Sequence, residues 1–390
     1  MRSNYKRLGN YIKLVEGRNA VLQTLPLMGL SITKKFIPSI ANLVGTDMTT
    51  YRTIIRNQFA YSPVTSRNGD KITIALFDDH DKALISQAYT PFEVIDKKEL
   101  LPEYLMMWFR RIEFDRYARF MSHGSARELF SWEDLCDLQM PIPSIDKQKE
   151  IVKEYNVIQN RIALNKQLIQ KLEDTAQAIY KQWFVDFEFP NENGKPYKSN
   201  GGEMIFNKEL EKEIPRGWEV KTIGDIGAIK AGGDKPIVFS AIKTNKCQIP
   251  IYSNGITDDG LYGYTNKSNY PKNSISISAR GTIGFCVLRR EDFDAIVRLL
   301  ILIPVHPESC IYLWQTIDKI EFDNSGSVQN QLTIPQVSVL NILYPTQEIL
   351  KEYDWIIYLL YKNLDWQAKQ NQKLSELKEM LLSKLATIEN

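Results

Sequence analysis

Residues 148–183 carry a hydrophobic pattern that the chain repeats near its end. Apolar residues recur at alternating steps of four and three, which predicts a long helix with one buried seam. The first seam runs through Ile151, Tyr155, Ile158, Ile162, Asn165, Ile169, Leu172, Ala176, Ile179 and Trp183. The second lies 198 residues later and runs through Ile349, Tyr353, Ile356, Leu360, Asn363, Gln367, Gln370, Leu374, Leu377 and Leu381. Because each seam must be buried, we expect the two helices to pack against each other.

The segment that precedes each helix is repeated as well. GSARELFSWEDLCDLQMPIP at residues 124–143 aligns without a gap with GSVQNQLTIPQVSVLNILYP at residues 326–345. Far upstream of these segments, Leu8 and Gly9 correspond to Ile223 and Gly224. The chain therefore consists of two similar halves, each a globular domain followed by a helix.

This duplication predicts an α+β fold, in which two mixed α/β domains form a pseudo-two-fold repeat around an antiparallel coiled coil of two long helices. We place the first domain at residues 1–145, its helix at 146–185, a linker at 186–213, the second domain at 214–345 and its helix at 346–390. The linker is assigned because its Asn, Gly, Lys and Pro residues bury little surface. Asn165 and Asn363 are expected to face each other and fix the register; two unrelated polar seam residues are the alternative.

Local patterns predict several elements within the two domains. Residues 102–117 have apolar and aromatic residues at helical spacing, which favours a helix whose aromatics lie in the core. Residues 71–77, 249–253, 274–278 and 285–288 alternate or are rich in β-branched residues and are expected to be strands.

Composition excludes several classes of protein. The 390 residues include 49 Lys and Arg against 47 Asp and Glu, so a net charge of +2 does not favour a general affinity for nucleic acid. No run of 18 apolar residues predicts a membrane span. The four cysteines form no CxxC pair, which argues against zinc and favours a reducing, cytoplasmic location.

Motifs for catalysis are absent from the sequence. It contains no GxxxxGK[ST] loop, no GxGxxG turn and no HExxH helix, and its three histidines are far apart. We therefore expect a chain without catalytic residues, metal or cofactor of its own.

The arrangement resembles the specificity subunit of type I restriction-modification systems over essentially the whole chain. The resemblance rests on the duplicated plan, the glycine-serine segment before each helix, QKEIV at residues 148–152, AIYKQWFVDF at 178–187 and EIPRGWEVKTIGDI at 213–226. It implies that each domain is a target recognition domain for one half of a split, asymmetric sequence in double-stranded DNA. It also implies that the helices act as a spacer and bind two methyltransferase subunits.

The resemblance implies cofactors only on partner subunits. Methyltransferase subunits would bring S-adenosylmethionine and methylate adenine at N6, and restriction and translocase subunits would use ATP and Mg²⁺.

Candidate DNA-contacting residues are chosen mainly from turn segments, where a side chain can reach a groove or a phosphate. The candidates are Arg18, Asn19, Tyr61, Tyr89, Arg119, His123, Ser125 and Arg127 in the first domain, and Tyr252, Asn254, Tyr264, Lys267, Arg280, Ser327, Gln329 and Asn330 in the second.

Trp183, Phe184 and Phe187 form an aromatic run at the end of the first helix. They are candidates for binding the methyltransferase subunits, with packing beneath the second domain as the alternative.

For the whole chain, the alternative function is a structural scaffold whose coiled coil separates two protein-binding domains. An enzyme acting on DNA by itself is disfavoured by the missing motifs.

Overall fold

A computed structural model describes residues 5–41, 45–66, 69–123, 128–322 and 331–388. The chain divides into two compact units. Unit 1 consists of Met1–Gln167 and Ala368–Asn390, and unit 2 consists of Leu168–Gln367. Each unit therefore contains one globular part together with segments of both long helices.

Two four-stranded sheets form the globular part of unit 1. The first consists of β2 (Ile12–Leu14), β9 (Thr90–Val94), β6 (Gln58–Tyr61) and β7 (Ile74–Leu76) in that spatial order, with all neighbours antiparallel. The second consists of β4 (Phe36–Pro38), β3 (Leu27–Leu30), β8 (Lys82–Ile85) and β5 (Arg52–Ile55), of which β3 and β8 are parallel. The opposed pair Phe59 and Phe92 stacks with ring centroids 4.9 Å apart and anchors the first sheet.

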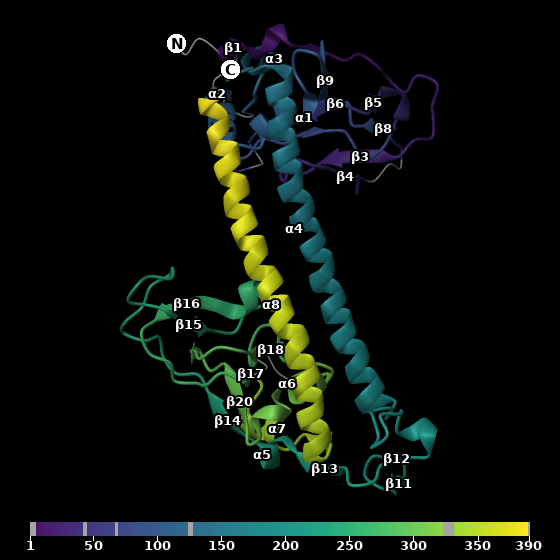
Figure 1. Ribbon diagram of the computed structural model, residues 1–390. Helices are drawn as coiled ribbons and strands as arrows, with labels where there is room; N and C mark the ends of the chain where they lie inside the picture. The colour runs from purple at the N-terminus through teal and green to yellow at the C-terminus, as the bar shows by residue number, and fades with distance from the viewer. Residues whose placement is uncertain (1–4, 42–44, 67–68, 124–127, 323–330, 389–390) are drawn as a thin grey trace. The chain divides into compact units, whose positions relative to one another are not determined.

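Unit 2 repeats the first sheet, and three of the four strands of the second sheet, in the same chain order. Its first sheet consists of β14 (Gly227–Ala231), β20 (Leu300–Pro304), β17 (Ser274–Ile277) and β18 (Cys286–Arg289), again antiparallel throughout (Figure 1). Its second consists of β16 (Leu261–Thr265), β15 (Ile249–Tyr252) and β19 (Asp294–Ala295), with β15 and β19 parallel as β3 and β8 are. The duplication thus includes the order and pairing of these strands, although the strand sequences of the two units show no evident similarity.

A short antiparallel pair closes each globular part. In unit 1, β1 (Tyr5–Arg7) pairs with β10 (Gln139–Pro141), and in unit 2, β13 (Glu219–Thr222) pairs with β21 (Asn341–Tyr344). The first strand of each pair leads into η1 (Leu8–Asn10) or α5 (Ile223–Ile226). The amide of Leu8 donates to Leu138 O at 2.8 Å, and that of Ile223 donates to Leu340 O at 3.0 Å. Equivalent positions of the sequence repeat therefore form equivalent backbone hydrogen bonds in the two units.

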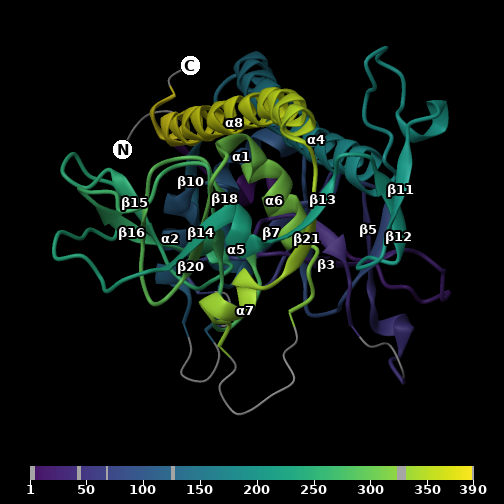
Figure 2. The same cartoon turned by 90° about the horizontal axis from the view of Figure 1, so that it is seen from below.

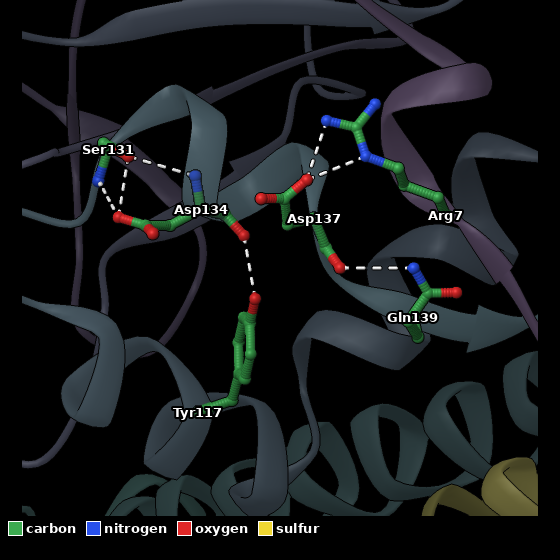
Figure 3. A network of polar contacts seen from close by, with 6 residues as sticks. All are labelled: Arg7, Tyr117, Ser131, Asp134, Asp137 and Gln139. Atoms are coloured by element: carbon green, nitrogen blue, oxygen red, sulfur yellow. Dashed lines mark hydrogen bonds and ion pairs between the residues drawn. The ribbon is translucent and has the colours of Figure 1, made fainter. Parts of the chain in front are cut away.

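Each repeated segment contains a short capped helix, α3 (Trp132–Cys136) in unit 1 and α7 (Ile334–Ser338) in unit 2. Figure 3 shows the first cap: Ser131 Oγ accepts from Asp134 N at 3.0 Å, and the Asp134 carboxylate accepts from Ser131 N at 3.2 Å. Tyr117 donates to the Asp134 carbonyl at 2.9 Å, and Arg7 forms an ion pair with Asp137 at 2.7 Å. In unit 2, Thr333 and Gln336 form the equivalent capping box.

Shorter helices cover the first sheets. The segment predicted as one helix forms α1 (Pro102–Phe109) and α2 (Ile112–Met121), with the break at Arg110 and Arg111. Tyr104 and Trp108 lie in the core as predicted, whereas Ile112 is 58% exposed because the break changes its direction. In unit 2, α6 (Cys310–Ile317) lies between α8 (Gln347–Lys384) and the β14-β20-β17-β18 sheet (Figures 1 and 2).

The two long helices pack antiparallel. α4 (Ile145–Tyr180) continues as a π-helical turn at Lys181–Val185, and α8 is followed by η7 (Leu385–Thr387). In unit 1, Ile151 near the start of α4 shares a core with Leu382 near the end of α8. In unit 2, Tyr180 at the end of α4 shares a core with Leu350 and Tyr353 at the start of α8. The predicted fold class is therefore confirmed.

The predicted seam fits α4 better than α8. Every predicted seam position on α4 is buried or half-buried. On α8 the column Tyr353, Leu360, Gln367, Leu374 and Leu381 faces inward, but the other column lies one residue later, at Leu350, Ile357, Leu364 and Asn371. Of the predicted α8 seam, only Asn363 and Leu377 are exposed, Leu377 at 46%, whereas the other positions are buried or half-buried. α8 also packs on the globular parts, so its buried face is wider than a two-helix seam and is rotated toward them.

The prediction that Asn165 and Asn363 face each other is wrong. Asn165 is 3% exposed, and its Nδ2 donates to Gln370 Oε1 at 3.5 Å. Asn363 is exposed and accepts a hydrogen bond from Gln367 Nε2 at 3.4 Å. The shift of the inward face by one residue places Asn363 on the solvent side of α8.

The segment predicted as a linker is a folded part of unit 2. It contains β11 (Met204–Asn207), which pairs with β12 (Lys212–Pro215). Phe187 and Phe189 are buried against Trp218, with Phe189 stacked at a centroid distance of 5.3 Å. These few aromatic residues bury enough apolar surface to fold the segment, although its average composition is polar.

No helix in the described part of the chain is long and apolar enough to span a bilayer.

The cap of α3 predicts a measurable stability effect. Ser131→Ala removes the acceptor for Asp134 N and should lower the free energy of unfolding by about 1 kcal/mol in urea titrations. Ser383→Ala is the matched control, because its hydroxyl bonds only to a carbonyl of its own helix, and it should stay within about 0.5 kcal/mol of the parent. Equal effects of the two substitutions would contradict the role of the cap.

Candidate nucleic-acid interface

In each unit, one hairpin loop is joined to the segment that follows the repeated glycine and serine. In unit 1, Phe130 N donates to Pro63 O, in the loop after β6, at 2.9 Å. In unit 2, Leu332 N donates to Ala279 O, in the loop after β17, at 3.0 Å. Phe130 and Leu332 are equivalent in the sequence repeat. Within each unit, the hairpin loop is therefore joined to the repeated segment by an equivalent backbone hydrogen bond.

The unit 2 site contains the exposed side chain of Arg280. Its Nη2 donates to Gln331 Oε1 at 2.8 Å, so the guanidinium lies beside the repeated segment. Lys267 is also exposed, and Tyr264 is half-buried while its backbone pairs with Ser240. Ser327, Gln329 and Asn330 lie outside the described residues.

Two other candidates of unit 2 are engaged in internal contacts. Asn254 Oδ1 accepts from Ala279 N at 2.7 Å, and its Nδ2 donates to Val297 O at 2.7 Å. The Tyr252 ring lies 3.5 Å from the Arg289 guanidinium, and its hydroxyl donates to Glu291 Oε1 at 3.3 Å. Burial raises the pKa of Tyr252 to about 12. Both side chains thus hold loops in place.

In unit 1, two predicted residues contact the repeated segment. Arg119 forms an ion pair with Glu128, and His123 forms an antiparallel bridge with Leu129. Arg119 and His123 are exposed. Ser125 and Arg127, which lie between these bridges in sequence, are outside the described residues.

The remaining unit 1 candidates divide by burial. Tyr61 is 1% exposed and Asn19 is 2% exposed, so their assignment to DNA contact is corrected. Tyr61 packs edge-on against Phe92, and Asn19 Oδ1 accepts from Gln23 N at 2.8 Å. Burial also raises the pKa of the Tyr61 hydroxyl.

Of the two further candidates of unit 1, one is exposed and the other is half-buried. Arg18 is exposed, with its backbone bridged to that of Arg52. Tyr89 is half-buried, and its hydroxyl accepts from Leu30 N at 3.5 Å.

The aromatic run that ends α4 is part of the core of unit 2. Trp183, Phe184 and Phe187 are 4%, 6% and 5% exposed. The Phe184 ring lies 4.5 Å from that of Tyr312 and 4.7 Å from that of Tyr353, measured between centroids. The assignment of these three residues to subunit binding is therefore corrected, because their side chains are used inside the unit.

Large apolar side chains are exposed on the long helices instead. In unit 2, Trp355 and Trp366 of α8 are 63% and 52% exposed, and Tyr358 and Leu359 lie on the same side of the helix. In unit 1, Val157 and Leu164 of α4 are exposed, and Val157 lines a surface groove with Leu101 and Val152. Val157 corresponds to Trp355 in the repeat. Seam analysis could not detect these residues, because they belong to the outward face.

Among the described residues, no group of three or more His, Cys, Asp or Glu side chains is arranged to hold a metal ion. The described part of the candidate interface presents exposed polar and charged side chains, including Arg280 and Gln331 in unit 2 and Arg119 and His123 in unit 1, which suits binding by hydrogen bonds and charge.

A sequence model of the type I restriction modification DNA specificity domain matches residues 49–174 and 215–379, well over half of the chain. The chain belongs to this family. The resemblance drawn from the sequence is therefore confirmed, and the two matched stretches fall in the two halves of the repeat.

Individual members of the specificity family align over most of their length. The type I restriction enzyme MjaIX specificity subunit of Methanocaldococcus jannaschii is 26% identical over 310 residues, covering 75% of this chain and 70% of that protein. The HindI specificity subunit of Haemophilus influenzae is 22% identical over 403 residues, covering 86% of each. The crystal structure of a type I restriction-modification S subunit from M. genitalium has the same fold, with a TM-score of 0.62, 17% identity and coverage of 99% of this chain and 96% of that one.

Arg280 provides a direct test of the unit 2 site. Arg280→Ala should weaken binding to the target DNA about tenfold, the discrimination of one bidentate arginine contact, when measured for the chain with its methyltransferase. Arg216→Ala is the control, because Arg216 is exposed in the same unit and pairs only with Glu203 among the described residues. If Arg280→Ala binds DNA as tightly as the control does, Arg280 is not part of the interface.

Proposed function

We propose that this chain is the sequence-recognising subunit of a type I restriction-modification complex and that each unit binds one half of a split, asymmetric DNA site. The observation that carries the proposal is the repeated pairing of a hairpin loop with the glycine-serine segment, through Phe130 in unit 1 and Leu332 in unit 2. The two loops differ in sequence while their supporting hydrogen bonds are the same. Two such sites on one chain suit two different half-sites.

The proposed role is binding, with catalysis supplied by other subunits. Methyltransferase subunits would bring S-adenosylmethionine and methylate adenine, and restriction and translocase subunits would bring ATP and Mg²⁺. The near-neutral net charge of +2 supports this division, because a chain that relied on its own phosphate contacts for affinity would need a larger excess of cations.

The exposed apolar faces of α4 and α8 are the proposed binding sites for two methyltransferase subunits. Trp355 and Trp366 expose aromatic rings of the kind that dominate protein interfaces. Val157 and Leu164 provide a smaller apolar surface at the equivalent place on α4. Two related faces on one chain suit two copies of the same partner, bound in pseudo-symmetric fashion.

The length of the helices is the proposed determinant of the gap between the half-sites. α4 has 36 residues, which at 1.5 Å per residue corresponds to about 54 Å. Successive major-groove sites on one face of a duplex are about 34 Å apart, so the helix is long enough to separate two recognition domains by one turn of DNA.

Methylome sequencing of a host that expresses this chain with its methyltransferase tests the function. The expected result is a split motif with adenine in each half, and loss of that methylation when the chain is omitted. A structural scaffold would instead leave the methylation pattern independent of this chain and would show no sequence-dependent retention of DNA. That outcome would refute the proposal.

Lengthening the helix pair should lengthen the gap. Inserting four residues at equivalent points of α4 and α8 adds about 6 Å of rise, which corresponds to one or two base pairs. Methylome sequencing of the variant should show both half-sites unchanged and the gap longer. The parental gap, found with a folded variant, would show that helix length does not set the spacing.

Removing the exposed aromatics of α8 should weaken subunit binding. Trp355→Ala with Trp366→Ala should reduce affinity for the methyltransferase at least tenfold in titration calorimetry, since buried aromatic anchors contribute about 2 kcal/mol or more. Phe120→Ala is the control, because Phe120 is 81% exposed on α2, away from the long helices in sequence. Equal affinities for the two variants would place the binding surface elsewhere.

A further inference from the structure

The turn between β19 and β20 has an unusual backbone. Val297 and Arg298 have φ values of 55° and 61°, a left-handed region that is costly for a β-branched residue such as Val297. Two hydrogen bonds hold the turn: Val297 N donates to Gly233 O at 3.0 Å, and Arg298 N donates to Gly232 O at 3.3 Å. Surrounding contacts thus impose a conformation that the turn residues disfavour, an arrangement that often marks functional sites.

Gly232 shows how closely the turn is supported. A Cβ atom at Gly232 would lie 2.8 Å from the backbone carbonyl of Ala295, which no ordinary side chain tolerates. The close approach lets the carbonyls of Gly232 and Gly233 reach the amides of the turn. The backbone position of Arg298 is therefore set by the hydrogen bonds of the turn to Gly232 and Gly233.

Asn254 connects this turn to the loop that carries Arg280. Its Oδ1 accepts from Ala279 N, and its Nδ2 donates to Val297 O, both at 2.7 Å. Ala279 precedes Arg280, and Val297 precedes Arg298. One amide thus fixes the backbone immediately before each of two arginines.

The two arginines have different surroundings. Both side chains are exposed. Arg280 donates to Gln331, whereas no hydrogen bond or ion pair within the described ranges engages the Arg298 guanidinium. A left-handed turn that served only to reverse the chain would be less strained with glycine at these positions, so the arginine side chain itself requires an explanation.

The geometry points to Arg298 as a second DNA-contacting residue beside Arg280, with Asn254 as the positioning residue for both. This inference rests on the proposed function, because it assumes that unit 2 binds a DNA half-site. Two guanidinium groups on neighbouring loops suit acceptor groups on one duplex, either guanine edges or phosphate oxygens, both of which arginine binds with its paired donors. The sequence does not indicate Arg298, because it lies within the apolar run AIVRLLIL that predicts a continuous strand.

Arg298→Gly separates a binding role from a structural one. Glycine adopts a φ of about 61° without strain, so the unfolding temperature of the chain should stay the same or rise. Affinity of the complex with its methyltransferase for a duplex carrying the methylated motif should fall at least tenfold. Arg216→Ala, the exposed control of the same unit, should leave that affinity unchanged. Wild-type affinity in Arg298→Gly would overturn the inference.

Asn254→Asp tests the positioning role. The variant keeps the acceptor for Ala279 N but places a carboxylate oxygen against Val297 O, so it should displace the Arg298 turn and spare the Arg280 loop. Its loss of DNA affinity should match that of Arg298→Gly, and the double variant should lose little more. Fully additive losses would show that Asn254 does not act through Arg298.

The outcomes also separate this inference from the proposed function. If the wild-type complex does not retain the motif duplex in preference to a scrambled one, the proposed function fails and the inference fails with it. If the wild-type complex does so and Arg298→Gly is indistinguishable from it, only the inference fails.

Discussion

The core of each unit depends on residues that are far apart in the chain. In unit 1, Ile151 and Tyr155 of α4 share a core with Leu382 and Leu385, and Tyr5 donates to the carbonyl of Ala386 at 2.9 Å. Full burial of a leucine contributes about 1.5–3 kcal/mol, a large share of the stability of a typical domain. Unit 1 therefore lacks part of its core until the last helix has formed, which couples the fold of the first domain to the end of the chain.

The duplicated scaffold explains how two units with little sequence similarity can share one topology. Elements close to the long helices retain their contacts: Tyr104 donates to Pro141 O at 3.1 Å, and Tyr312 donates to the equivalent Leu343 O. Loops farther from the helices differ in length and in the side chains that anchor them. The scaffold thus constrains the backbone at the base of each candidate loop and leaves its exposed residues free to vary, which suits the proposed binding of two different half-sites.

The sequence predicted what depends on periodicity and repetition, and it failed where tertiary contacts decide. Both long helices, their antiparallel pairing and the exposed position of Arg280 follow from patterns along the chain. The rotation of the α8 seam does not, because it depends on packing against the globular parts as well as on α4. Tyr61 and Asn19 were misassigned because a polar residue in a turn-rich segment can equally satisfy an internal hydrogen bond or a core contact.

The middle of the helix pair contributes less to its stability than the ends do. Asn165 is buried and makes only a long hydrogen bond to Gln370, and Gln367 Oε1 and Asn371 Oδ1 are buried without a partner among the described protein groups. A buried polar atom without a partner costs about 1–3 kcal/mol, so these positions offset part of the apolar burial along the seam. The ends, by contrast, pack aromatic and aliphatic side chains into the cores of the two units. The helix ends therefore share the cores of the globular parts, and a change that loosens one globular part should also loosen the helix ends packed against it.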